Sequence, residues 1–164
     1  MSEFNYAEIL KMTEAQEALL LFSSFTNDDA YAVGKFISER MYEKKKELAV
    51  AVRNMKGTIL YQHLPNGTNF MNQNWMNRKF NTVSCFEKSS LGVWAKTSIS
   101  GEGIEAQGLD SKDFAFCGGG FPVRLKNGEI VGVITVSNYP HMEDHRLLVE
   151  ALAEYLQVEN VPGI

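Results

Sequence analysis

The chain has 164 residues and a formal net charge of -4 at pH 7, with 45% hydrophobic and 22% charged residues. This profile is typical of a globular protein; it excludes a disordered or fibrous chain and does not indicate a nucleic-acid partner. A chain of this size buries roughly 70% of its unfolded surface when it folds, which predicts a single domain over residues 1–164.

Cysteine spacing and the N-terminus add two further exclusions. Cys85 and Cys117 lie far apart and form no CxxC pair, so neither a zinc site nor a disulfide scaffold is indicated. Residues 1–4 lack the basic region that precedes the apolar core of a signal peptide, and no run approaches the ~18 apolar residues of a membrane helix. We therefore expect a cytoplasmic protein with no membrane partner.

Two helices are predicted at the start of the chain. Across residues 4–22, apolar side chains recur close to the i, i+3, i+4, i+7 pattern of an amphipathic helix, which ends near residues 23–24. Asn27 or Asp28 then offers an N-cap oxygen to a second helix that runs to the three lysines at 44–46. Cations suit a helix C-terminus, so we interpret these lysines as a solvated helix end rather than an anion-binding patch.

A hairpin and three more helices are expected further along the chain. Residues 48–52 and 58–63 read as two strands joined by a turn in which Gly57 supplies the bend. Helices are favoured over residues 69–87, residues 91–97 and, at the end of the chain, residues 140–157. The glycine-rich stretch between the last two of these helices predicts a loose connection up to residue 111.

A second hairpin, over residues 121–136, is the most strongly marked element. Asn127-Gly128 suits the two positive φ values of a type I′ turn. Residues 130–136 are almost entirely apolar, so this strand should lie inside the sheet with both faces covered. Counted outward from the turn, the predicted pairs are Lys126 with Glu129, Leu125 with Ile130, and Phe121 with Ile134.

Three glycines open the first arm of this hairpin. Gly118, Gly119 and Gly120 contribute no side chains and tolerate unusual backbone angles, which predicts a bulge or a close approach of another group. They match neither a Walker loop nor a GxGxxG fingerprint. Cys117, just before them, reads either as an exposed thiol or soft ligand, or as a small buried residue.

A second candidate site lies on the helix at 69–87. Asn72, Trp75, Arg78 and Lys79 share a broad helical face that suits a planar or anionic ligand. The alternative is that Trp75 anchors the core while the two cations reach solvent or pair with carboxylates across a subunit contact.

Two histidines mark the start of the last helix. His141 and His145 are four residues apart, the spacing at which two imidazoles share a ligand, and Asp144 is placed to orient either ring. Because no third ligand stands at a recognised spacing, we expect a helix-start cap and a solvent-facing pair rather than a metal site. There is also no GxSxG elbow or Ser-His-Asp order, so hydrolase chemistry has no support.

Several of these motifs, taken in order, resemble one known family. Together they are similar to a branch of the GlcG/HbpS-like superfamily, which carries the label haem-degrading domain. Cys117 stands where relatives commonly have His, and Asn138 stands where they usually have Gly. The likeness is strongest over residues 48–156, and the motifs that carry it are Gly67-Thr68, Asn72, residues 75–83, residues 88–90, residues 118–123, residues 132–137 and Asp144-His145.

This resemblance implies an α+β fold of the profilin-like, GlcG-like type. An antiparallel sheet with helices packed against it is expected, in a homodimer or larger homo-oligomer. From the chain itself we expect the hairpin at 121–136 to be central, the hairpin at 48–63 to flank it, and the first, second and last helices to cover the sheet.

Two functions follow as hypotheses. The first is binding of a small ligand, haem or another planar anionic molecule, in a pocket between the glycine strand and the helix that carries Trp75, Arg78 and Lys79. The second is a non-catalytic oligomeric scaffold or interaction module in which those residues secure the subunit interface. The ligand-contacting residues expected under the first hypothesis are Asn72, Trp75, Arg78, Lys79, Cys117, Gly118, Gly119, Gly120 and His145. No set of nucleophile, base and metal residues points to an enzyme.

Overall fold

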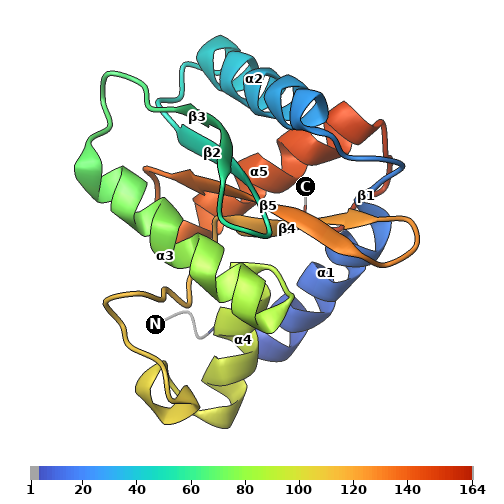
Figure 1. Cartoon of the computed structure of the whole chain (residues 1–164). Helices are drawn as coiled ribbons and strands as arrows, with labels where there is room; N and C mark the ends of the chain where they lie inside the picture. Colours follow the sequence, from blue (N-terminus) through green and yellow to red (C-terminus); the bar gives the residue numbers. More distant parts are fainter. Residues whose placement is uncertain (1–3, 164) are drawn as a thin grey trace.

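A computed structural model describes residues 4–163, and its architecture is α+β (Figure 1). The expectation of no signal peptide was drawn from residues 1–4. Of these, residues 1–3 lie outside the described residues. In the described chain the sheet has five strands in the order β1-β4-β5-β2-β3. The strands are β1 (Leu21–Phe22), β2 (Ala49–Asn54), β3 (Ile59–His63), β4 (Gly120–Leu125) and β5 (Ile130–Ser137).

The sheet is antiparallel except at one edge. The β4–β5 and β2–β3 hairpins lie side by side through the antiparallel β5–β2 pair, so the predicted central and flanking hairpins are confirmed. The short edge strand β1 pairs in parallel with β4, which makes the sheet mixed rather than purely antiparallel as expected.

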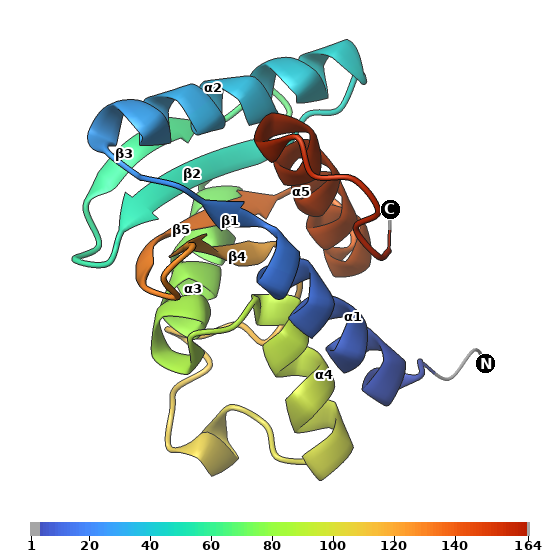
Figure 2. The same ribbon diagram turned by 90° about the vertical axis from the view of Figure 1, so that its right-hand side faces the viewer.

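Helices cover both faces of the sheet (Figure 2). The helices are α1 (Tyr6–Leu19), α2 (Asn27–Glu43), α3 (Phe70–Phe86), α4 (Ser90–Ser100) and α5 (His141–Leu156), with a 3-10 turn at Glu105–Gln107. Strand alternation assigns the faces: Val50 and Val52 join the core beneath α2 and α5, whereas Ala49 and Ala51 pack against Met76 of α3. The helices at 69–87 and 140–157 are thus confirmed, and α3 is a sheet-covering helix that the sequence did not assign.

The turn of the central hairpin differs from the prediction. Gly128 has a positive φ of 94°, but Asn127 is not among the residues with positive φ, so the turn is not type I′. Instead, the Gly128 amide donates to the Leu125 carbonyl and the Leu125 amide to the Glu129 carbonyl, which describes a longer turn ending in a left-handed glycine.

The longer turn changes the pairing beside it. Ile130 faces Arg124 rather than Leu125, and Lys126 does not pair with Glu129. A register shift between Val123 and Arg124 then restores the expected register, so the predicted Phe121–Ile134 pair is present.

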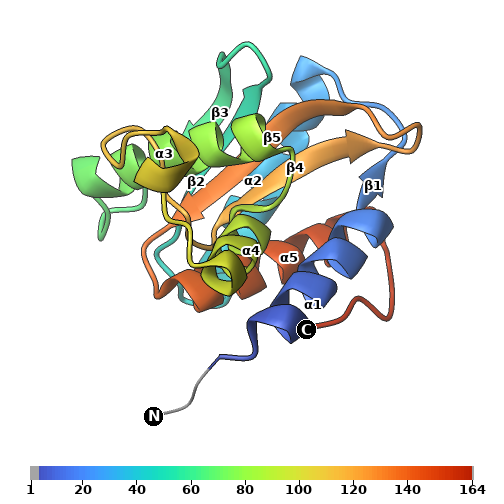
Figure 3. The same ribbon diagram turned by 90° about the horizontal axis from the view of Figure 1, so that it is seen from below.

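The first helix is the other clear correction. It ends at Leu19 rather than near residues 23–24, and Leu21–Phe22 form β1. It also packs mainly on α4 instead of covering the sheet, as Figure 3 shows from below. Its buried residues are consequently Thr13, Gln16 and Glu17, while Leu19 is 42% exposed.

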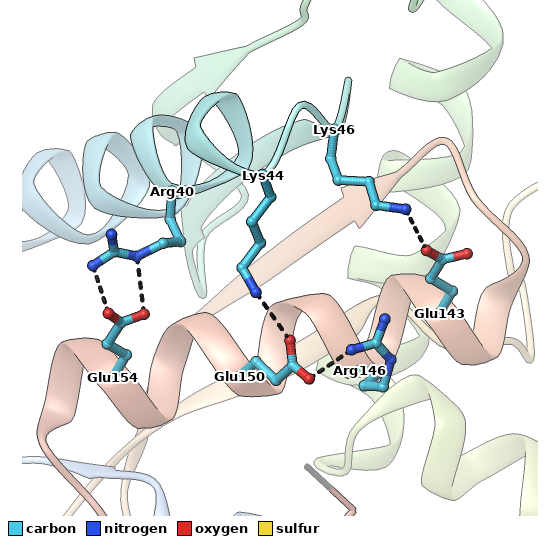
Figure 4. Close-up of polar contacts among 7 residues, drawn as sticks. All are labelled: Arg40, Lys44, Lys46, Glu143, Arg146, Glu150 and Glu154. Carbon is cyan, nitrogen blue, oxygen red and sulfur yellow. Dashed lines mark hydrogen bonds and ion pairs between the residues drawn. The ribbon is translucent and has the colours of Figure 1, made fainter.

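Helix α2 is fastened to α5 by ion pairs. Its N-cap is Thr26, which forms a capping box with Asp29, rather than the predicted Asn27 or Asp28. Of the three lysines that follow it, Lys44 and Lys46 pair with glutamates of α5, whereas a solvated helix end was expected. The pairs between this region and α5 are Arg40–Glu154 at 2.6 Å, Lys44–Glu150 at 3.4 Å and Lys46–Glu143 at 2.9 Å (Figure 4).

Within residues 4–163, no helix is both long enough and apolar enough to cross a bilayer.

Candidate functional site

A cleft of about 420 Å³ opens where α3, the end of β5 and the start of α5 meet. We call it the α3–α5 cleft. Four of the predicted site residues line it, three in α3 and Cys117 just before the glycines, together with a group from the β5–α5 junction. Its lining residues are Asn72, Trp75, Lys79, Cys117, Ser137, Asn138, Tyr139, His141 and Asp144.

A buried ion pair lies among these lining residues. Lys79 is only 2% exposed, and its Nζ donates to Asp144 Oδ2 at 3.0 Å and to the Val136 carbonyl at 2.8 Å. The other carboxylate oxygen of Asp144 accepts the Tyr139 amide at 2.9 Å. Burial raises the pKa of Asp144, and the Lys79 ammonium acts in the opposite direction. The pair therefore ties α3, β5 and α5 together.

The three glycines are explained by this packing inside the chain. A Cβ at Gly119, where φ is 118°, would lie 2.6 Å from Lys79 Nζ and 2.8 Å from the Val136 carbonyl oxygen. A Cβ at Gly118 would collide with the His141 carbonyl, and one at Gly120 would lie 2.8 Å from a methyl carbon of Val83. The groups that approach this backbone closely therefore belong to the protein's own helices and to β5.

Burial shifts the pKa values of two further groups in the cleft, Cys117 and His141. Burial raises the pKa of the Cys117 thiol, although Lys79 opposes this shift. Burial lowers the pKa of His141, and the positive charge of Lys79 lowers it further. The Gly118 amide donates to His141 Nδ1 at 3.1 Å, so the neutral ring carries its proton on Nε2. His141 is thus a hydrogen-bond donor in the cleft.

Trp75 and Arg78 form a stacked pair at one side. The Arg78 guanidinium lies 4.2 Å from the centre of the Trp75 ring and donates through Nε to the Phe114 carbonyl at 3.3 Å. Arg78 is not among the lining residues, whereas Trp75 is. Asn72 donates to Asn138 Oδ1 at 3.3 Å and to Ser137 Oγ at 3.4 Å, which links the first turn of α3 to the end of β5.

His145 lies apart from this cleft. Its ring is 2% exposed, and Nε2 hydrogen-bonds Gln16 Oε1 of α1 at 2.7 Å. Burial lowers the pKa of His145 to about 3. The expectation of a solvent-facing histidine pair is therefore wrong for this residue, because α1 covers it. Within residues 4–163 no group of three or more His, Cys, Asp and Glu side chains is arranged to hold a metal ion.

The predicted site residues are thus brought only partly together. The sequence missed Ser137, Asn138 and Tyr139 as lining residues, and it gave His141 and Asp144 only a capping or orienting role. A signal was present, since polar residues follow an apolar strand directly and precede a helix. Asn138 has a φ of 156°, in a region that glycine adopts more readily, and it is the position where the resembling family usually has Gly.

Comparison with known proteins extends the picture. A family model described as "Haem degrading protein HbpS-like" matches residues 25–153. A UPF0303 protein of Rhizobium etli is 38% identical over 138 residues, which are 84% of either chain.

Solved structures share the fold. The crystal structure of Ybr137w protein superposes with a TM-score of 0.82 at 27% identity and covers 90% of this chain and 87% of that one. The crystal structure of a PduOC–haem complex gives a TM-score of 0.61 at 14% identity, with 79% and 94% coverage. At that identity the second comparison shows the fold alone.

Proposed function

The chain belongs to the HbpS-like family of haem-degrading proteins, and from this premise we propose that it binds a small planar ligand of the haem type in the α3–α5 cleft. The proposal draws its main support from the cleft itself, which gathers an aromatic wall, a thiol and several hydrogen-bonding groups in one concavity. Pockets of a few hundred Å³ with a few convergent polar groups are typical of small-molecule sites.

The residues present fit a haem-type group in two ways. Trp75 offers a ring to a planar ligand, and Arg78 holds that ring from outside the cleft. Cys117 places a sulfur among the lining residues, and cysteine thiolate is one of the side chains that ligate haem iron. When bound, haem would supply iron-centred ligand and redox chemistry. His141 is less suited to ligate iron, because Gly118 donates to its Nδ1 and leaves the proton on Nε2.

The buried pair also bears on the competing scaffold hypothesis. A lysine that secures a subunit interface should find its carboxylate on the partner, but Lys79 finds both of its acceptors within its own chain. This arrangement favours a role in shaping the cleft and gives the ligand-binding hypothesis the stronger support.

Haem titration followed at the Soret band tests the proposal. Wild-type protein is expected to saturate, and Trp75→Ala to weaken binding by up to about tenfold because a ring contact is lost. Cys117→Ala is expected to change the position of the Soret band, since it removes the sulfur. Tyr31→Ala removes an exposed aromatic ring on α2, outside the cleft, and serves as the control with unchanged affinity. The absence of saturable binding by wild type would rule the proposal out.

A further inference from the structure

The buried ammonium of Lys79 has one hydrogen-bond donor to spare. An ammonium carries three N–H groups, and two of them are used by Asp144 Oδ2 and the Val136 carbonyl. Lys79 is 2% exposed, yet it is one of the residues that line the cleft. A buried donor without an acceptor is costly, so a ligand atom that accepts from it gains more than a surface contact would.

A second group of donors stands at the start of α5. His141 presents Nε2–H, for which residues 4–163 provide no acceptor. Pro140 is the N-cap and forms no side-chain cap hydrogen bond. The His141 amide forms no hydrogen bond within residues 4–163, as expected for an uncapped first turn. The positive end of a helix of 16 residues therefore lies beside the buried ammonium.

The nearby carboxylates are already engaged. Asp144 accepts from Lys79 with one oxygen and from the Tyr139 amide with the other. Glu143 pairs with Lys46, which follows the end of α2 (Figure 4). Asp144 balances the charge of Lys79, so attraction for an anion comes from the free N–H groups and the helix end rather than from an unpaired cation.

We propose that the α3–α5 cleft takes its ligand with a carboxylate directed inward, accepting hydrogen bonds from Lys79 and from His141 at the start of α5. This inference rests on the proposed function and adds the ligand's class and orientation. For a haem-type ligand, the propionate groups are what the inner end of the cleft recognises. The chain discriminates by the acid group and not only by the flat ring.

Metal-free protoporphyrin IX and its dimethyl ester provide a test that leaves the protein unchanged. The two differ in the acid groups and share the ring, so the free acid is expected to bind at least about tenfold more tightly. Quenching of porphyrin fluorescence measures both affinities, and haem is titrated in parallel. Equal affinities for acid and ester overturn the inference while leaving the proposed function standing. Failure of all three to bind overturns both.

Variants locate the effect. Lys79→Met alone would leave Asp144 buried without its partner, so the double change Lys79→Met with Asp144→Leu removes the pair as a unit, and circular dichroism verifies its fold. The preference for acid over ester is expected to shrink at least about threefold in the double variant. Lys96→Met, at an exposed lysine of α4 outside the cleft, is expected to keep the wild-type preference. An undiminished preference in the folded double variant contradicts a role for Lys79.

Discussion

A methyl group at position 119 would lie 2.6 Å from the Lys79 ammonium and 2.8 Å from the Val136 carbonyl, which are the two groups that hydrogen-bond to each other. The backbone there also has a φ of 118°, which side chains with a Cβ adopt only under strain. The glycine and the buried lysine therefore depend on one another.

Gly119→Ala is accordingly expected to lower the free energy of unfolding by at least about 2 kcal/mol, combining backbone strain with displacement of Lys79. Gly103→Ala is the matched control, because its Cβ meets nothing within 4 Å and no unusual φ is involved. Its effect should stay within about 1 kcal/mol. Urea denaturation measures both, and a Gly119→Ala protein as stable as the control would contradict this account of the segment.

The sequence predicted that something approaches the glycine strand, but not what. Three glycines in a row indicate a close neighbour because only a missing Cβ leaves the room. The neighbour's identity depends on how α3 and α5 pack, and that packing is a tertiary property. Lys79 illustrates the limit: it shares a helical face with Arg78 in sequence, yet one side chain is buried against Asp144 and the other stacks on Trp75.

Helix α5 carries its polar residues inward at its N-terminal end and its apolar residues inward beyond. Asp144 and His145 are both 2% exposed, which is unusual for ionisable side chains. Docking of this helix therefore makes stability depend on protonation.

His145 makes that dependence measurable. Burial lowers the pKa of His145 from 6.5 to about 3, so below pH 6.5 the unfolded chain binds a proton that the folded chain does not. The contribution of His145 to the free energy of unfolding is fully present above pH 6.5 and is lost as the pH falls toward 3. Relative to His145→Gln, the wild-type unfolding free energy should fall more steeply between pH 6 and 4, by about 1.4 kcal/mol per pH unit. If denaturant titrations show the same pH dependence of the unfolding free energy for wild type and His145→Gln, then His145 is not neutral in the folded protein.

At this scale the fold was largely predictable, and the misses have physical causes. The β4–β5 hairpin was predictable from apolar strands on either side of a turn dipeptide. Asn-Gly also suits a turn in which only glycine is left-handed. The predicted pairing next to the turn was therefore wrong by one residue. In α1 the apolar spacing indicated a sheet-facing helix. Its docking on α4 instead buries Thr13 and Gln16, and the Gln16 side chain donates to the Pro162 carbonyl.

For the whole molecule, exposed apolar side chains favour self-association. Phe70 is 68% exposed and Met71 is 55% exposed, both in the first turn of α3. Strand β3 is also an edge strand of the sheet with unpaired backbone groups along one side. A homodimer or larger homo-oligomer would cover such surfaces with a second copy.

Light scattering coupled to size-exclusion chromatography checks this proposal. At micromolar concentration we expect a mass of at least two chains, against 18.4 kDa for one. The double change Phe70→Ser with Met71→Ser should reduce that mass if α3 forms the contact. Ile99→Ser, at a side chain that is also 55% exposed but on α4, should leave it unchanged. A wild-type mass near 18.4 kDa would refute self-association.

The ion pair between Lys79 and Asp144 has a consequence for folding during synthesis. Its partners stand 65 residues apart, and the glycine that makes room for it lies between them. A growing chain that has emerged from the ribosome only as far as β5 holds a lysine that still awaits its carboxylate. The cleft thus exists only once the final helix has docked. A ligand of the cleft therefore binds only the fully folded protein. Its concentration in the cell then helps to set the stability of the folded state.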